Sequence, residues 1–374
     1  ESAAGNPLYP NTDWYKEMLN TSPLTEHTLA VRGGGKKGNF AMSLGFLDNK
    51  GVVDNSGYKK YDFRINADTK IKNILTLGGN VFGTWSNRQP LDVNSFFGAI
   101  RNTTPGVVPR YEDGRYGGEM FPGLPQGANP RAYVDNIRGD YERQKLGLKF
   151  FSVVNFMENL EWESSFGFNY NNNRNWEYVR PYALWNLQTG LEYQKKPSVS
   201  SLFNGSIRNY TTVLNTLLRY RETIAENHHL AVLLGFDQQY NRMDKFDAKK
   251  NDILGDDAIY ILDAGANLEA INGSGTDDAL QSYFGRLNYD FKGKYLFEAN
   301  ARYDGSSRFA KENRWGFFPS FSAGWRVTEE EFAQPLKAVF DEIKIRGSWG
   351  RLGNNRIGDY TYQVVYGSYL YPFG

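Results

Sequence analysis

The 374-residue chain is almost neutral, with 43 lysines and arginines against 42 aspartates and glutamates. This balance excludes the broad positive field that attracts nucleic acid, so we expect no nucleic-acid partner. The absence of cysteine excludes disulfides and thiolate metal sites, and three histidines are too few for a histidine metal centre. We therefore expect no cofactor and no metal.

The amino-acid composition favours an all-β membrane protein. Aromatic residues make up 16% of the chain, 39 residues are glycine, and the mean hydropathy is negative. The longest purely apolar run, near residues 230–234, is far shorter than the ~20 residues of a helical span. Transmembrane β-barrels show this combination, because their outer band is apolar, their rims are aromatic and their lumen is polar.

Strands are predicted from a side-chain period of two, which places successive residues on opposite faces. Residues 1–24 contain three prolines and are expected to form a loop that leads into the barrel. Residues 25–352 then supply about twelve strands. Eight lie near residues 26–32, 39–47, 60–69, 74–86, 141–153, 160–171, 207–220 and 230–240, and four more lie between residues 281 and 351.

The segment 281–351 shows the alternation most clearly. Every second residue from Tyr295 to Tyr303 is apolar or aromatic, whereas the residues between them include Glu298, Asn300 and Arg302. We interpret the polar side as the lumen of an antiparallel barrel. On this interpretation five arginines face the lumen: Arg286, Arg302, Arg308, Arg326 and Arg346. Glu161 and Glu163 are also better explained as lumen charges than as paired catalytic acids.

The connections between strands alternate in length. Short turns are expected near residues 33–38, 70–73, 154–159, 223–229, 291–294 and 328–342. Long loops are expected at about 87–140, 172–206 and 241–280, and residues 353–374 would begin a further loop. Outer-membrane barrels have short periplasmic turns and long extracellular loops, so we assign the long loops to the outside.

Two motifs could indicate a nucleotide-binding or a calcium-binding site. Gly33, Gly35 and Gly38 match a dinucleotide-binding string, but a strand rather than a helix follows them, which favours a turn between strands. The loop acids Asp252, Asp256, Asp257 and Asp263 lack the spacing of a calcium loop, so a solvated surface loop is favoured.

The chain resembles the SusC/RagA-type TonB-dependent outer-membrane transporters. The motifs that carry this resemblance are, in order, Asn11–Trp14, Leu29–Gly34, Gly45–Gly51, Tyr61–Asn66, Gly285–Tyr289, Arg302–Phe309, Phe318–Arg326 and Ile345–Asn354. The resemblance implies a 22-stranded barrel closed by an N-terminal plug, of which about twelve strands are present here. We expect the plug and the final strands to lie outside these residues.

The resemblance also implies a function and partners. The expected activity is active import of an oligosaccharide or peptide across the outer membrane, energised by the TonB complex through the plug and assisted by a SusD-like lipoprotein. Outer-membrane lipid would surround the barrel. A siderophore- or vitamin-type receptor, or a structural or adhesive barrel, remain as alternatives. No catalytic constellation is present, so we do not expect an enzyme.

Ligand-binding residues are sought in the long loops. Trp176, Tyr178, Tyr182 and Trp185 could stack on the apolar faces of sugars, and Arg110 with Tyr111 offers a similar mixture of charge and ring. An aromatic girdle or packing between loops explains the same residues. Both interpretations stay open on the sequence.

Overall fold

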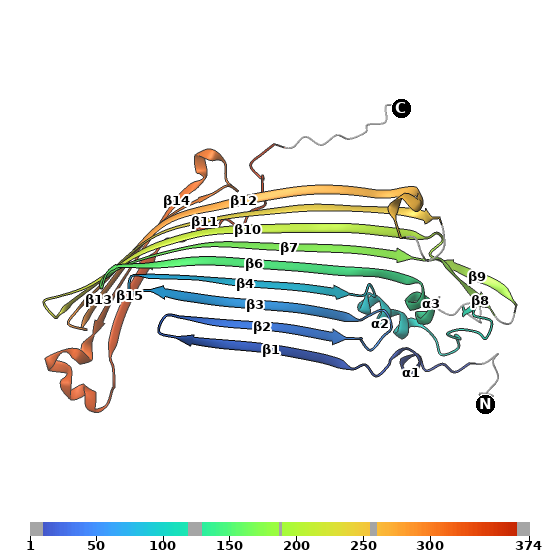
Figure 1. The fold of residues 1–374 in the computed structure, drawn as a ribbon, viewed down its shortest axis with the longest axis horizontal. Coiled ribbons are helices and arrows are strands. Elements are labelled where there is room, and N and C mark those ends of the chain that lie inside the picture. The colour runs from blue at the N-terminus through green and yellow to red at the C-terminus, as the bar shows by residue number, and fades with distance from the viewer. Residues whose placement is uncertain (1–9, 119–128, 187–188, 255–259, 365–374) are drawn as a thin grey trace.

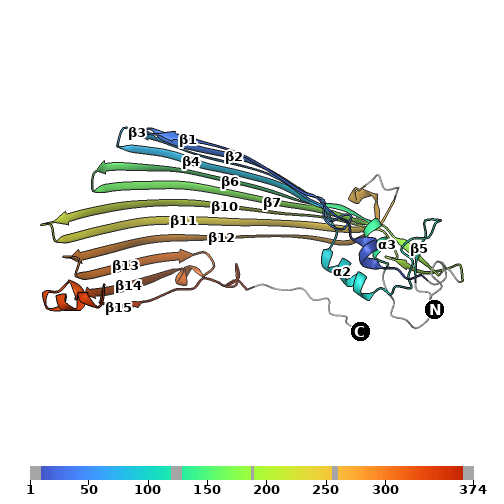
Figure 2. The ribbon, with the colours of Figure 1, turned by 90° about the horizontal axis from the view of Figure 1, so that it is seen from below.

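The computed structural model describes residues 10–118, 129–186, 189–254 and 260–364. Its main element is a twelve-stranded antiparallel sheet in which each strand pairs with its neighbours in chain order. Figure 1 shows these strands side by side and Figure 2 shows that the sheet is curved. The strands are β1 (Leu24–Gly35), β2 (Gly38–Asn49), β3 (Tyr58–Ile71), β4 (Leu75–Arg88), β6 (Ile137–Met157), β7 (Leu160–Val179), β10 (Ser201–Ile224), β11 (His228–Ile253), β12 (Gly265–Phe291), β13 (Tyr295–Ser306), β14 (Trp315–Arg326) and β15 (Lys344–Gly350).

The twelve predicted strands are confirmed, but several run further than expected. β7 continues to Val179, β10 begins at Ser201, β11 continues to Ile253 and β12 begins at Gly265. Much of 172–206 and 241–280 is therefore strand rather than loop. Alternation fades in these extensions because Asn, Asp and Lys are common on both faces, while the hydrogen-bonded ladder continues. The extracellular placement of the loops stays a prediction.

The short turns are confirmed at five hairpins, which join β1 to β2, β3 to β4, β6 to β7, β10 to β11 and β12 to β13. Gly35 pairs directly with Gly38, so the glycine string spans a two-residue hairpin and not a nucleotide loop. The connection from β14 to β15 is formed by the 3-10 helices η3 (Val327–Glu329) and η4 (Glu331–Ala338).

The opposite end of the sheet carries the remaining structure (Figure 1). It includes α1 (Trp14–Met18), α2 (Val93–Asn102), α3 (Pro130–Asp135) and a small sheet of β5 (Tyr116–Gly117), β8 (Tyr182–Asn186) and β9 (Leu191–Lys196). The 3-10 turns η1 (Leu262–Ala264) and η2 (Lys311–Asn313) precede β12 and β14. The largest buried cluster joins Trp14 and Met18 of α1 with Phe96 and Ile100 of α2. We call this end of the molecule, with α1, α2, α3 and the small sheet, the cap. The main apolar core of the described residues lies in the cap and not on the large sheet.

The large sheet has one apolar face, and the other described residues leave most of it uncovered. Strand register places its residues together across neighbouring strands, and many are exposed: Leu29 64%, Leu44 58%, Phe63 37%, Phe166 47%, Leu214 40%, Leu234 55%, Phe297 41% and Phe321 46%. A soluble protein rarely exposes an apolar surface of this extent. No helix among the described residues is long and apolar enough to cross a membrane.

Aromatic rings form two rows on the apolar face. Near the long-loop end, His27, Phe46, Tyr61 and Trp85 contact one another in sequence across β1 to β4, with centroids 5.0–6.4 Å apart. Near the short turns, Phe291 contacts His228 and Tyr295. On β12 the rows are represented by Tyr283 and Phe291, separated by about 27 Å of strand. An apolar band of ~25 Å between aromatic girdles is typical of a transmembrane barrel.

Candidate functional site

The opposite face of the sheet is polar and holds charges in pairs. Arg219 on β10 lies 2.6 Å from Glu161 and 2.8 Å from Glu163, both on β7. The register brings these side chains together, since Arg219 pairs with Glu161 and Leu217 pairs with Glu163. The two glutamates therefore serve an ion-pair network, and their partner is a permanently charged arginine rather than a group that could exchange protons.

Two grooves run along the polar face. One, of about 880 Å³, lies at the short-turn end and is lined by Arg221, Asp290, Glu298, Lys344 and Arg346, among others. The other, of about 550 Å³, lies further along the strands and is lined by Arg64, Lys149, Glu163 and Asp237. Charges of both signs line each groove. These surfaces suit a polar protein segment or a hydrophilic solute better than an apolar ligand.

The five arginines assigned to the lumen have different partners. Arg286 donates to Asn300, and Arg302 lies over the Phe284 ring and pairs with Asp304. Arg326 pairs with Glu342, and Arg346 lines the groove at the short-turn end. These four positions share the strand parity of the polar face. Their exposure to a lumen stays a prediction.

Arg308 has a distinct position. It lies in the connection after β13 and pairs with Asp278 of β12 at 3.3 Å and with Asp359 at 2.8 Å. The neighbouring Tyr360 donates to Asp277. Arg308 therefore joins the segment that follows β15 to β12. The contact lies where the 27-residue strand β12 extends beyond its 12-residue neighbour β13.

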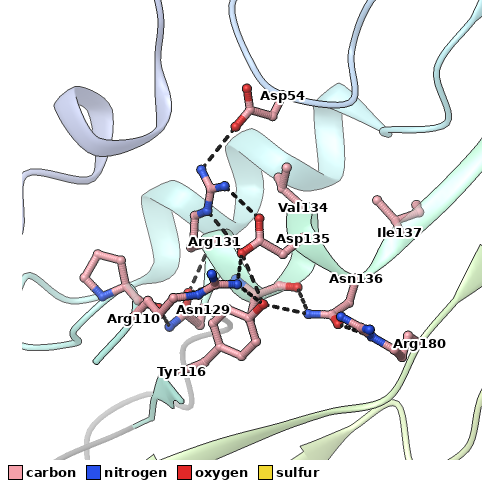
Figure 3. A network of polar contacts seen from close by, with 12 residues as sticks. Asp54, Arg110, Tyr116, Asn129, Arg131, Val134, Asp135, Asn136, Ile137 and Arg180 are labelled. Carbon is pink, nitrogen blue, oxygen red and sulfur yellow. Dashed lines mark hydrogen bonds and ion pairs between the residues drawn. The ribbon is translucent and has the colours of Figure 1, made fainter. Parts of the chain in front are cut away.

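A polar network organises the cap at the long-loop end (Figure 3). Asn129 is fully buried; its amide donates to the carbonyls of Val108, Pro109 and Gly117, while its side-chain oxygen accepts from the first backbone N–H groups of α3. Asn129 followed by Pro130 is a favourable helix start, because Asn caps the helix and proline presets its first turn. One side chain thus fixes both α3 and the preceding loop.

Asp135 is the acidic centre of this network. It accepts from Arg110 at 2.8 Å, from Arg131 at 2.8 Å and from the Tyr116 hydroxyl at 3.1 Å. Arg131 reaches further to Asp54 in the loop between β2 and β3, so the network joins two connections. Burial lowers the pKa of Arg131, but its bonds to Asp135 and Asp54 outweigh this effect and raise it.

The candidate ligand residues separate into two groups. Tyr178 is 5% exposed, and both it and Trp176 contact the ring of Tyr260. The register of β7 places them on the same face as Phe166 and Tyr170, which is the apolar face. These two rings therefore pack against the Tyr260 segment and away from the polar face.

The second group lies in the cap. Tyr182 is 9% exposed and meets Tyr116 edge-on, and burial raises the pKa of its hydroxyl to about 12, with Tyr133 and Tyr116 acting in the same direction. Arg110 lies over the Tyr116 ring, and Arg115 lies over Trp185. Tyr111 lies in the same loop and hydrogen bonds through its backbone to Arg115. These contacts match loop packing, while a role in ligand binding stays a proposal.

Several residues that organise the cap were absent from the sequence prediction. They are Asp54, Asn129, Asp135 and Asn136. The Asn129-Pro130 pair could have indicated a helix start, but no periodicity connects the other positions. The acids Asp256 and Asp257 of the discounted calcium loop lie outside the described residues. Elsewhere in the described part of the chain, no group of three potential metal ligands occurs.

Comparisons with known proteins agree with this architecture. Residues 84–373 match the family model described as TonB dependent receptor-like, beta-barrel. The chain is 29% identical to the TonB-dependent receptor SusC of Bacteroides thetaiotaomicron, over 97% of this chain and 37% of that protein. It is 29% identical to a TonB-dependent receptor of Formosa agariphila, over 90% of this chain and 31% of the relative.

Solved structures show the same fold. The RagAB peptide importer in its open-open state superposes with a TM-score of 0.77 at 22% identity, over 96% of this chain and 40% of that one. Its closed-closed state gives a TM-score of 0.76. The chain thus spans well under half the length of these relatives. The sheet, open in this structure, has the strand arrangement of a barrel wall, and the chain belongs to the TonB dependent receptor-like β-barrel family.

Proposed function

We propose that these residues form part of the wall of a TonB-dependent importer that carries an oligosaccharide or peptide across the outer membrane with a SusD-like surface lipoprotein. The observation that carries the proposal is the pairing of an uncovered apolar face, bounded by aromatic rows, with a charged opposite face. Such a wall separates lipid from a polar passage. The similarity to SusC, and to the fold of the RagAB peptide importer, supports this choice.

The grooves of the polar face are where an N-terminal plug would lie. The groove at the short-turn end is broad and lined by mixed charges, which suits the surface of a folded polar domain. The cap and the strand extensions lie at the other end, where a nutrient and a lipoprotein would arrive from outside. In this proposal the described residues position ligands and perform no covalent chemistry.

The test is growth of a strain that lacks the gene on a panel of glycans and peptides. We expect a selective defect on one nutrient class, restored by the intact gene. A gene product without a plug or TonB-contact segment, or a strain with no defect on any nutrient, would overturn the importer. Fractionation of the membranes checks outer-membrane location independently of the substrate.

A further inference from the structure

A pair of arginines occupies an unusual position on the apolar side of the wall. Arg174 of β7 and Arg208 of β10 are both exposed, and the register gives them the parity of Phe166 and Tyr170. Moving along β7 from the short turns, one meets Phe166, then Tyr170, then Arg174. Trp176 and Tyr178 follow Arg174 on the same face, and the ladder connects Arg208 through Asn172 and Gln144 to Trp85, so the arginines lie at the level of the aromatic row near the long loops.

The two arginines occupy diagonal positions on neighbouring strands. Arg174 pairs with Ser206, and Arg208 is two residues further along the same strand. Diagonal neighbours of this kind have Cα atoms about 7–8 Å apart, which long side chains span easily. Two like charges at this separation repel each other unless an anion lies between them.

Two carboxylates lie opposite this pair on the same face, but neither forms a close ion pair with Arg174 or Arg208. Asp244 lies opposite Arg208 but accepts hydrogen bonds to both of its oxygens from Arg242, at 3.0–3.3 Å. Glu142 lies opposite Arg174 but accepts from Trp85 and Gln144, at 2.7 and 2.6 Å. Neither Arg174 nor Arg208 makes an ion pair or side-chain hydrogen bond with the residues that the structure describes.

We propose that Arg174 and Arg208 together bind the phosphate of an anionic lipid headgroup at the outer surface of the membrane. The proposal rests on the proposed function only for the placement of the wall in a bilayer. Aromatic rows mark the level of the headgroups, so charged groups at this level meet phosphates. Arginine presents a planar fork of donors that fits phosphate oxygens, and Ser206 and Asn172 beside the pair offer further polar contacts.

The experiment measures lipid preference directly. The full-length protein is reconstituted in phosphatidylcholine vesicles, and the association of spin-labelled phosphatidic acid is compared with that of spin-labelled phosphatidylcholine. We expect a preference for phosphatidic acid, which Arg174→Gln and Arg208→Gln each lower about five-fold. Arg174→Lys keeps the charge and should retain most of the preference. Arg143→Gln, which removes an exposed arginine of β6 on the polar face, is the matched control and should leave the lipid preference unchanged.

Two outcomes would overturn the proposal. One is an unchanged preference in the variant that carries both Arg174→Gln and Arg208→Gln. The other is displacement of the lipid by inorganic phosphate at constant ionic strength, which would identify a site for free phosphate. Outer-membrane fractionation of the same variants separates this result from the proposed function: a protein found elsewhere contradicts the importer, whereas a correctly placed protein without lipid preference contradicts only this inference.

Discussion

At the scale of single residues, two networks of ion pairs join neighbouring segments, one on the polar face of the sheet and one in the cap. Arg219 holds Glu161 and Glu163 on the neighbouring strand, and Asp135 holds two arginines and a tyrosine in the cap. Removal of Arg219 or Asp135 would leave two like charges close together. Their repulsion is strong because both networks are partly shielded from water. Single substitutions at the shared partner therefore test these networks best.

Arg219→Met should destabilise the protein by about 1–3 kcal/mol, because two glutamates lose their common donor and repel each other. Denaturant unfolding of the protein in detergent or lipid measures the change. Adding Glu161→Gln and Glu163→Gln to Arg219→Met should recover part of the loss. Arg221→Met, on the same strand and face but exposed, is the control; an equal loss there would contradict the role of the ion pairs.

Glu330, in the connection between β14 and β15, predicts a pH dependence. Hydrogen bonds from Tyr295, Lys294 and Trp325 lower the pKa of its carboxyl to about 2. An unfolded glutamate has a pKa near ~4.3, so the stabilisation is fully present above that value and is lost as the pH falls towards 2.

The measurement is stability against pH for the native protein and for Glu330→Gln. The variant should be less stable near neutral pH and should lose less stability between about pH 4 and pH 2. Glu331→Gln changes the exposed next residue and provides the control. Parallel curves for the native protein and Glu330→Gln would show that this carboxylate does not contribute.

At the scale of elements, each strand of the large sheet has one apolar and one polar face. The connections in the cap are held by their own buried contacts. Phe321 and Ser322 are adjacent on β14 yet belong to opposite faces, and Phe321 is 46% exposed. The cap, in contrast, depends on Asn129 and the buried residues around α2 and α3. Changes in a strand should therefore affect membrane assembly, whereas changes in the cap should affect local order.

Phe321→Arg should block membrane assembly, because an arginine on the lipid face near the midplane costs ~2–4 kcal/mol. Ser322→Arg, one residue away on the polar face, should assemble, and Arg326→Ala should be tolerated as well. Heat-modifiable gel migration of the membrane fraction distinguishes these outcomes. Equal tolerance of Phe321→Arg and Ser322→Arg would mean that the two faces have been assigned wrongly.

Asn129→Ala should loosen the cap without unfolding the wall. It removes a helix cap worth about 0.5–2 kcal/mol and leaves three carbonyls without their donor. Limited proteolysis between β4 and β6 should become faster, while gel migration of the barrel stays unchanged. Asn102→Ala, at the exposed end of α2, is the matched control. Unchanged proteolysis of Asn129→Ala would contradict its role.

At the scale of the whole molecule, the sheet is an arc with two free edges among the described residues. β1 and β15 each pair on one side only, and their unpaired backbone groups invite further strands. Closure of the arc removes those edges in a barrel, where every strand has two neighbours. The family match over residues 84–373 and a superposition that covers 40% of the solved chain are consistent with an arc of a larger barrel wall.

The 374 residues alone should therefore self-associate in detergent through β1 and β15. Sedimentation at rising protein concentration should show assemblies larger than one chain, and amides of β1 and β15 should exchange hydrogen faster than those of β7 and β10 in dilute samples. A single species at every concentration, with β1 and β15 as protected as the central strands, would contradict this expectation.

The sequence alone determined the strands and their two faces. The side-chain period of two is a local property that is repeated over twelve segments. In a strand, adjacent residues such as Phe321 and Ser322 point to opposite faces of the sheet. The motifs that resemble the transporter family lie mostly on these strands, so the family was also accessible. The extensions of β7, β10, β11 and β12 were missed because polar residues occur on both faces there, so the period of two fades.

Only the tertiary structure decided how the residues of the long connections pack. It buried Tyr178 and Tyr182, brought Arg131 to Asp54 across 77 residues of chain, and placed Arg174 diagonally beside Arg208. Such contacts depend on strand register and chain path, which no local pattern encodes. The sequence therefore specified which side of each strand is apolar and which is polar, while long-range packing selected the side chains that act together.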